Sequence, residues 1–407
     1  MKDASDVIVV GGGPSGSFTA LKLAEHGIDV TVYEEHDEIG IPSHCAGHLS
    51  IHGLRSLGLY PLPSGIVENT FRGAVFYSPC GNRFSVRLAS PVTCVVNRAL
   101  FDKHLAEKAQ SAGAIFSLNS KVENLILENG IVKGVRVELR GRTEKKMAKI
   151  VVDAEGISPR ILKETGLSGS DRRMLVNGVE AEAENVKDMS LDMVEVFLGA
   201  EYASGLYAWL IPKKDGRAKV GLAVRGRDPQ KLLQKFVTEH PIAREKLHHA
   251  RIARVSVHPI SLGGPITKAY SSGFLAVGDA ASHVKSTTGG GVVFGLTGAA
   301  IAAEIVCEAV RRDDCSSRFL SAYQRRLNDA LGFDAKIMVR MRRTLDAMSD
   351  RRLDALVGMC TKLGLEKTLQ KVGEIDFQGR TLLRILRSPR AFAAVGYSFL
   401  TYLFAKV

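Results

Sequence analysis

The chain of 407 residues is longer than one hydrophobic core usually extends, so we expect two or more lobes. Hydrophobic residues make up 45% and charged residues 24%, which excludes a disordered or fibrous protein. The 55 basic and 43 acidic residues give a net charge of +12, which favours an anionic partner. Part of this charge gathers at 340–343 and 380–390 without an aromatic-rich RNA-binding signature, so we expect no nucleic acid.

A strand, a tight turn and a helix open the chain. Residues 6–10 are apolar and β-branched, Gly11-x-Gly13-x-x-Gly16 follows, and a second apolar run ends at Glu34. In such a βαβ unit the glycines permit the turn, the approach of a pyrophosphate and close packing of helix on strand, while the acidic residue suits ribose hydroxyls. An ordinary glycine turn is the alternative, and the pattern does not distinguish FAD from NAD. The residues expected at this cofactor are Gly11, Gly13, Pro14, Ser15, Gly16, Glu34 and Glu35.

Strand patterns return at 71–88, 122–139 and 193–225, whereas 97–112, 229–247 and the chain after 297 have helical spacing. These patterns predict a mixed α/β (α+β) fold. We expect a Rossmann-like dinucleotide-binding domain at 1–75, 97–165 and 268–310, an inserted antiparallel-sheet substrate domain at 76–96 and 166–267, and a helical region at 311–407. The apolar stretch 391–404 is shorter than the ~20 residues of a membrane span. It is expected either to rest on a bilayer or to close the last lobe.

Six cysteines stand at 45, 80, 94, 307, 315 and 360, and no two form a C-x-x-C pair. We therefore expect a cytoplasmic protein without a signal peptide, without a ferredoxin-type cluster, and with an external electron donor. His44, Cys45, His48 and His52 lie close together in the sequence, but their spacing matches no common zinc site, so no metal is predicted.

Three segments resemble the FAD-dependent hydroxylase superfamily typified by p-hydroxybenzoate hydroxylase. Residues 273–281 form an apolar strand ending in Gly278-Asp279, followed by Gly289-Gly290-Gly291. The resemblance implies that Asp279 binds the ribityl chain of FAD and that the glycines bring backbone amides close to the flavin ring; a helix cap is the alternative for Asp279. Segment 97–102 resembles the one whose arginine, here Arg98, contacts the FAD phosphates. Segment 151–156 is similar to the Asp-Gly motif, with Glu155 replacing Asp, and implies cofactor contacts for Asp153 and Gly156.

Two further segments are similar to the geranylgeranyl reductase family. Residues 42–47 resemble its P-x-x-C-G motif, with Ala46 replacing glycine, and residues 207–213 with 220–222 resemble Y-x-W-x-F-P-K…V-G, with Ile211 replacing phenylalanine. The resemblance implies that Cys45, Ala46 and Gly47 lie beside the flavin, with Cys45 as proton donor or pocket wall; an inert buried thiol is the alternative. It implies substrate contacts for Tyr207, Trp209 and Pro212. Because Tyr207 and Trp209 are two residues apart on a strand, they share a face and suit the wall of an apolar channel, unless they are core aromatics.

The resemblance implies an FAD-dependent reductase that saturates the C=C bonds of geranylgeranyl chains in archaeal-type membrane lipid precursors. The expected substrate is an isoprenoid lipid or a prenyl diphosphate, and the expected electron donor is ferredoxin or a reduced nicotinamide. Peripheral contact with the cytoplasmic membrane face is a further expectation. The alternatives on the same fold are a flavin monooxygenase, a halogenase whose W-x-W-x-I-P motif overlaps residues 207–212, and an electron-relay flavoprotein.

Overall fold

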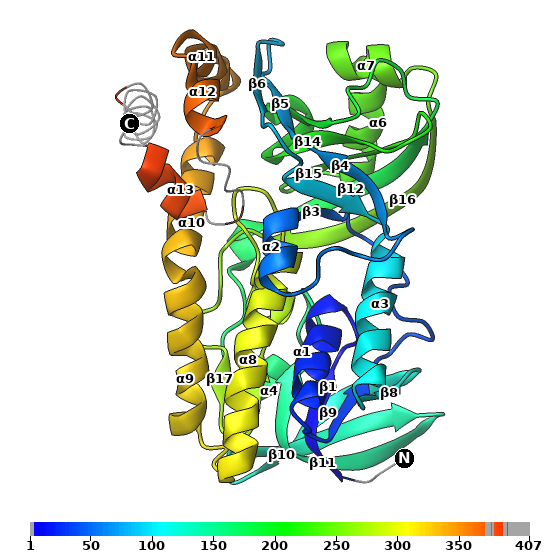
Figure 1. Cartoon of the computed structure of the whole chain (residues 1–407), viewed down its shortest axis with the longest axis vertical. Coiled ribbons are helices and arrows are strands. Elements are labelled where there is room, and N and C mark those ends of the chain that lie inside the picture. The colour runs from blue at the N-terminus through cyan, green and yellow to red at the C-terminus, as the bar shows by residue number, and fades with distance from the viewer. Residues whose placement is uncertain (1–3, 371–375, 377, 386–388, 390–407) are drawn as a thin grey trace.

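The structure is a computed structural model that describes residues 4–370, 376, 378–385 and 389. These residues form two lobes, each built on a large sheet, and a column of helices runs along one side of both lobes (Figure 1). The mixed α/β fold expected from the sequence is confirmed. The predicted apolar stretch 391–404 lies outside the described residues.

The dinucleotide-binding lobe contains an eight-stranded sheet. Its strands are β1 (Ala4–Val10), β2 (Val30–Tyr33), β8 (Ile115–Ser117), β9 (Ser120–Glu128), β10 (Ile131–Leu139), β11 (Arg142–Asp153), β17 (Tyr270–Ser271) and β18 (Phe274–Ala276). Strands β18, β11, β1, β2 and β8 are parallel neighbours in that order, and β9, β10 and β17 pair antiparallel. Val10 aligns with Tyr33 on one side and Asp153 on the other. The carboxyl ends of these three strands therefore meet at one edge, where ligands bind in open parallel sheets.

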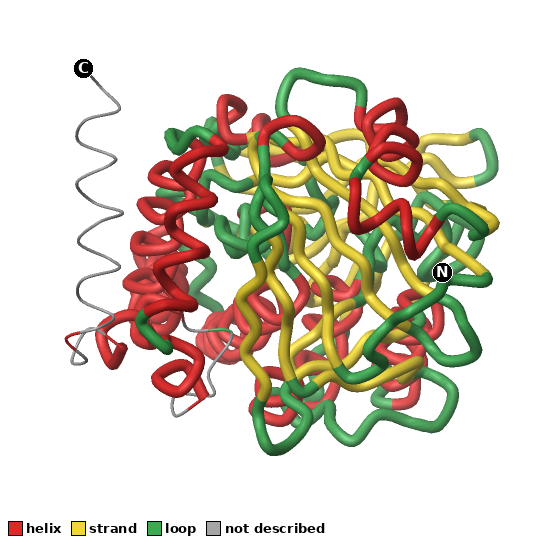
Figure 2. Tube along the Cα trace, turned by 90° about the horizontal axis from the view of Figure 1, so that it is seen from above, coloured by secondary structure: helices red, strands yellow, loops and turns green. Residues whose placement is uncertain are grey.

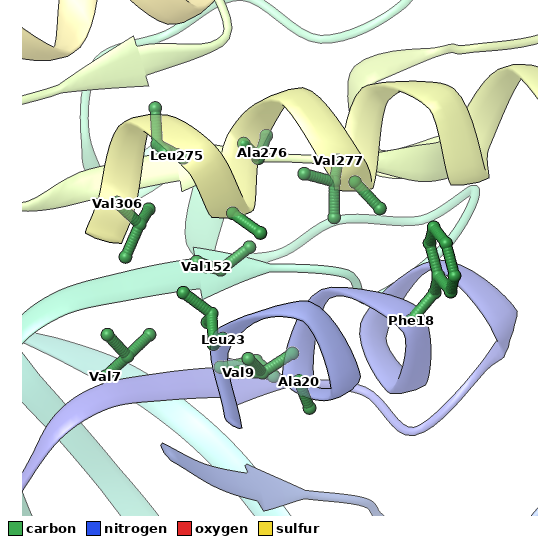
Figure 3. Close-up of a cluster of buried hydrophobic side chains, with 14 of the residues drawn as sticks. Val7, Val9, Phe18, Ala20, Leu23, Val152, Leu275, Ala276, Val277 and Val306 are labelled. Carbon is green, nitrogen blue, oxygen red and sulfur yellow. The ribbon is translucent and has the colours of Figure 1, made fainter. Parts of the chain in front are cut away.

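Three helices cover the parallel strands, with α1 (Pro14–Glu25) between α3 (Arg98–Ser111) and α8 (Val292–Arg312). Val9, Phe18 and Val306 come from β1, α1 and α8, and all three are fully buried in the shared core (Figure 3). Each such side chain contributes roughly 1.5–3 kcal/mol through the apolar surface it removes from water. Within the described residues, α8 is the one helix long and apolar enough to cross a membrane, and 67% of its most apolar window is buried inside the protein.

The second lobe contains a seven-stranded sheet in the order β16-β12-β15-β14-β13-β5-β6. Its strands are β5 (Gly73–Tyr77), β6 (Arg83–Arg87), β12 (Leu175–Glu184), β13 (Met193–Phe197), β14 (Gly205–Pro212), β15 (Ala218–Val224) and β16 (Arg251–Ser261). All pairs are antiparallel except β13 with β5, which run parallel. The expected domain boundary at residue 75 falls inside β5, so this sheet begins at Gly73. Helices α5 (Ala200–Ala203), α6 (Pro229–Glu239) and α7 (Pro241–Leu247) belong to the same lobe as this sheet.

A three-stranded sheet joins the lobes, with β7 (Thr93–Val96) between β3 (His48–Ser50) and β4 (Val67–Phe71). The remaining short elements are α2 (Ile51–Ser56), α4 (Ile161–Glu164) and the 3-10 turns η1 (Arg172–Met174) and η2 (Gly278–Ala281). Because β4 leads directly into β5, the small sheet fixes how the second lobe sits above the first.

The helical column follows α8 and lies beside the strands of both lobes (Figure 2). Its members are α9 (Ser317–Leu327), the π-helical turn η3 (Asn328–Gly332), α10 (Phe333–Asp346), α11 (Asp350–Lys362), α12 (Leu365–Gln370) and α13 (Gln378–Ile385). Helix α9 packs on α8, whereas α11 and α12 pack on β6 of the second sheet. The column therefore bridges the two lobes, and the helical prediction for the chain after residue 297 is confirmed for the described residues.

Candidate active site

A cavity of about 1280 Å³ extends from the carboxyl edge of the parallel sheet to the second sheet and the helical column. It exceeds the ~300–1,000 Å³ typical of small-molecule sites, so it accommodates more than one small ligand. Its lining changes along its length. Backbone amides and carboxylates line the end near β1, whereas aliphatic and aromatic side chains line the end near β13 and α10.

The glycine turn after β1 forms the first end of the cavity. A Cβ on Gly16 would lie 1.9 Å from the carbonyl oxygen of Gly11, so helix and turn approach as closely as glycine allows. Helix α1 begins with Pro14 at its first turn, and the Gly13 N-cap supplies no side-chain hydrogen bond. Free amides at such a helix start and the helix dipole favour an anion. This end therefore suits a pyrophosphate.

Glu34 is held in one orientation beside this turn. Its Oε2 accepts a hydrogen bond from the Gly12 amide at 2.6 Å, and its Oε1 accepts one from the His36 amide at 3.0 Å. The His36 ring lies 2.6 Å from the same Oε1. A carboxylate has about four acceptor positions, so Glu34 retains capacity for ribose hydroxyls. Glu35 lines the same part of the cavity.

Asp279 lies in the middle of the cavity, on η2. Val277 is the N-cap of this turn, and among the described residues no donor forms a hydrogen bond with the Asp279 carboxylate, so the helix-cap alternative does not apply. Burial raises the pKa of Asp279, and Arg98 opposes that shift. A Cβ on Gly291 would lie 3.0 Å from Asp279 Oδ1. The carboxylate and the 289–291 backbone thus form one surface, which suits a polyhydroxy chain followed by a planar ring.

Arg98, Asp102 and Cys45 lie together at the cavity. The Arg98 guanidinium donates to both carboxylate oxygens of Asp102, at 3.0 and 2.9 Å, with both side chains almost buried. Burial lowers the pKa of Arg98, but Asp102 and the Cys45 thiol raise it more, so the guanidinium stays charged. Cys45 Sγ also accepts a hydrogen bond from the Gly47 amide at 3.4 Å. Cys45 therefore lines the cavity in a polar environment and is not fully buried in the core.

The histidines near Cys45 have separate partners. His44 stacks on His258 with ring centroids 5.3 Å apart, and burial lowers the pKa of His258 to about 4. His48 Nε2 lies 2.7 Å from Thr93 Oγ1, and burial lowers its pKa to about 4. Across the described part of the chain, no group of three or more His, Cys, Asp or Glu side chains is arranged to hold a metal ion.

Tyr207 and Trp209 project from β14 into the cavity and form an edge-to-face pair with centroids 6.0 Å apart. The Tyr207 hydroxyl donates to the Thr288 carbonyl at 2.8 Å and so ties β14 to the glycine turn before α8. A Cβ on Gly221 would lie 2.5 Å from the Trp209 ring, so the glycine of the V-G pair makes room for the indole. The aromatic pair shares one face, as the strand spacing predicted.

Glu180 on β12 was not identified from the sequence, yet it lines the cavity near Trp209. Burial raises the pKa of its carboxyl to about 7, against the opposing effect of the Lys219 ammonium. The only sequence signal was two glutamates alternating with apolar residues at 179–183, which is also the pattern of an ordinary half-buried strand.

The far end of the cavity is apolar. Its wall residues from the second sheet are Val194, Val196, Leu198, Leu206 and Ile211, and those from the column are Met341, Leu345, Met348, Leu353 and Leu382. The basic segment 340–343 is divided: Arg340 and Arg343 are exposed, whereas Arg342 is 5% exposed, lines the cavity and pairs with Asp346 at 2.7 Å.

Comparison with known proteins identifies the family. Residues 4–330 match the FAD binding domain family. Digeranylgeranylglycerophospholipid reductase 2 of Methanopyrus kandleri is 36% identical over 357 residues, which are 86% of this chain and 89% of that protein. Digeranylgeranylglycerophospholipid reductase of Methanocaldococcus jannaschii is 33% identical over 359 residues, 88% and 90% of the two chains. This chain belongs to the digeranylgeranylglycerophospholipid reductase family.

Solved structures agree with this membership. A geranylgeranyl bacteriochlorophyll reductase-like protein from Thermoplasma acidophilum superposes with a TM-score of 0.83 at 27% identity, covering 88% of this chain and 91% of that one. A flavin-dependent brominase superposes with a TM-score of 0.69 at 19% identity, covering 84% and 87%, and shares the fold alone. The chain is an FAD-dependent oxidoreductase.

The part of the cavity from the glycine turn to the 289–291 backbone fits FAD. The glycine turn and Glu34 suit the adenosine diphosphate half of FAD. The Asp279 carboxylate accepts no hydrogen bond from the described residues, so it can accept hydrogen bonds from the ribityl hydroxyls. The 289–291 backbone, Cys45 and Ala46 then lie where the isoalloxazine ring would follow. Of the expected cofactor residues, Gly11, Gly13, Pro14, Ser15, Glu34, Glu35, Cys45, Ala46, Arg98, Gly156, Gly278, Asp279, Gly289, Gly290 and Gly291 line the cavity.

Four expected site residues lie outside the cavity wall. Gly16 and Gly47 shape the backbone behind it, since a Cβ at either would strike a carbonyl oxygen. Asp153 is fully buried and accepts a hydrogen bond from the Glu155 amide at 2.9 Å, whereas residues 154–156 line the cavity. The Pro212 carbonyl accepts from the Asn69 side chain at 3.0 Å, at the end of β14 beyond the cavity. Direct contacts of Asp153 with the cofactor and of Pro212 with the substrate stay predictions.

Proposed function

We propose that this chain saturates the C=C bonds of geranylgeranyl chains in an archaeal-type lipid precursor. The observation that carries the proposal is the continuity of one cavity, whose FAD end opens directly into an apolar channel between the second sheet and the helical column. A prenyl chain is flexible and apolar, so its reaction requires a channel that desolvates and orients it. Reduced FAD, when bound, supplies the hydride that adds to one carbon of a double bond.

The chain's own residues provide orientation and exclusion of water. Tyr207 and Trp209 offer aromatic edges and faces against which a trisubstituted double bond packs. The Tyr207 hydroxyl holds the turn before α8 and so maintains the distance between this aromatic wall and the 289–291 backbone. The aliphatic side chains from β13 and α10 bind the rest of the prenyl chain.

The electron donor and the site of action form part of the same proposal. An external donor, either ferredoxin or a reduced nicotinamide, reduces the bound FAD. We propose a cytoplasmic protein that contacts the membrane face peripherally, because its substrate is dissolved in the bilayer. The net charge of +12 favours an anionic lipid surface or a phosphorylated head group.

The test is an anaerobic assay of the purified chain with dithionite and either digeranylgeranylglyceryl phosphate or geranylgeranyl diphosphate. Product masses that rise in steps of two hydrogens, with reoxidation of the bound flavin, are expected. A flavin that is reduced but leaves both prenyl masses unchanged contradicts the proposal. Product that requires molecular oxygen favours the monooxygenase or halogenase alternative.

A pair of variants on α10 tests whether the apolar channel holds the prenyl chain. Leu345→Trp fills the channel, whereas Thr344→Trp places the same ring on the neighbouring residue, which does not line the cavity. We expect L345W to reduce prenyl turnover at least tenfold while dithionite still reduces its flavin, and T344W to retain turnover. Equal turnover in both variants contradicts binding in this channel.

A further inference from the structure

Saturating a double bond requires two hydrogens of different origin. A hydride adds to one carbon, and a proton must reach the other carbon from an acid within hydrogen-bond reach, because the channel excludes bulk water. Such an acid must line the cavity near the flavin end, bear an exchangeable proton near neutral pH, and retain an oxygen that faces the reacting atoms.

Glu180 meets the geometric conditions. It lies on β12, where Gly178, Val179 and Glu180 line the cavity. In the sheet Glu180 is opposite Gly221, and the absence of a side chain there leaves space for the Trp209 ring. The Glu180 carboxyl lies beside the Trp209 indole N–H, which lowers its pKa. Its Oε2 is buried and has no other hydrogen-bond partner among the described residues, so the carboxyl keeps free acceptor positions beside the aromatic wall.

Groups from several elements face this carboxyl. Burial raises its pKa, and the neighbouring Glu182 raises it further, whereas Lys219 on β15, Trp209 on β14 and Arg98 on α3 lower it. The resulting pKa of about 7 means that Glu180 both holds and releases a proton at neutral pH. Lys219 is itself 5% exposed, and its ammonium nitrogen lies 3.9 Å from a carboxylate oxygen of Glu68. Its positive charge therefore stabilises the Glu180 carboxylate that forms after proton release.

We propose that Glu180 is the general acid that protonates the second alkene carbon, an inference that rests on the proposed prenyl reduction. The O–H bond of Glu180 breaks and a C–H bond forms, while the hydride from reduced FAD forms the other C–H bond and leaves FAD oxidised. The carboxylate is reprotonated from water when product leaves and the channel opens to solvent. Cys45, beside Arg98, then shapes the flavin pocket.

The matched variants are Glu180→Gln and Glu195→Gln. Glu195 is a buried glutamate on the same sheet, but it faces away from the cavity and pairs with Lys246 at 2.7 Å. Both proteins are first checked for FAD content and for reduction by dithionite. In a single anaerobic turnover, we expect E180Q to form saturated product at least 100-fold more slowly than wild type, and E195Q to match wild type.

The pH profile and an activity-independent measurement complete the test. Wild-type turnover should fall as pH rises through about 7, because the acid form is lost, and this limb should be absent in E180Q and return in Glu180→Asp. Infrared titration of the substrate-free protein should show a protonated-carboxyl band that disappears near the same pH and is missing in E180Q. An unchanged rate and pH limb in E180Q, or loss of the limb in Cys45→Ser alone, overturns the role of Glu180. Absence of saturated product from wild type overturns the proposed function itself.

Discussion

Replacing Glu180 with glutamine should change how the stability of the protein depends on pH. In the unfolded chain a glutamate has a pKa of 4.5, whereas the folded protein raises the pKa of Glu180 to about 7. Between these values the native state binds more protons than the unfolded state, so the free energy of unfolding falls as pH rises. The shift corresponds to about 3 kcal/mol, and this is an upper bound because the carboxyl opens onto a cavity whose water screens it.

Urea unfolding of wild type and E180Q at pH 4, 5, 6, 7 and 8, with FAD in constant excess, measures this effect. The two proteins should be nearly equally stable at pH 4, where both side chains are neutral. As pH rises to 7, the free energy of unfolding of E180Q should increase relative to that of wild type by up to about 1.4 kcal/mol per pH unit. Above pH 7 the difference should stay constant. A stability difference that is constant across this range would refute the argument that burial holds the Glu180 carboxyl in its neutral form.

Three further substitutions probe the cofactor end and the column. Gly16→Ala should lower FAD affinity roughly ten- to 100-fold by equilibrium titration, because its Cβ would lie 1.9 Å from the Gly11 carbonyl, whereas Gly358→Ala, with open space around it, should not. Lys285→Met should lower the free energy of unfolding by about 3–5 kcal/mol, since it breaks an ion pair with the fully buried Asp376 at 2.8 Å. Tyr207→Phe keeps the ring but removes the hydrogen bond to Thr288, so it should cost about 1–3 kcal/mol of stability. Unchanged unfolding midpoints in the last two variants would contradict these contacts.

The identity of the cofactor end could be predicted because its determinants are local. A β-branched run, three glycines at fixed spacing and an acidic residue about 20 positions later describe one βαβ unit, and the amides that donate to the Glu34 carboxylate belong to Gly12 and His36. The same holds for Tyr207 and Trp209, whose shared face follows from the two-residue period of a strand. Motifs of this kind also indicated the family.

The chemistry at the centre of the cavity depended on residues far apart in the sequence. Glu180 has an unusual pKa only because burial, Lys219 and Trp209 all affect its carboxyl. Nothing in the sequence of β12 distinguishes Glu180 from Glu182. Asp153 and Pro212 matched family motifs, and the fold gives both local hydrogen bonds, from the Glu155 amide and the Asn69 side chain.

In the helical column, too, the sequence determined the helices and the tertiary structure determined which side chains face inward. Its helical periodicity was evident from the sequence, but which arginine of 340–343 faces inward depended on which side of α10 borders the cavity. Lys285 and Asp376 are 91 residues apart, and only the folded chain brings them into one buried pair. A sequence specifies backbone period and local turns through neighbouring residues, whereas the pKa and orientation of a site residue follow from its surroundings, which the packing of distant elements creates.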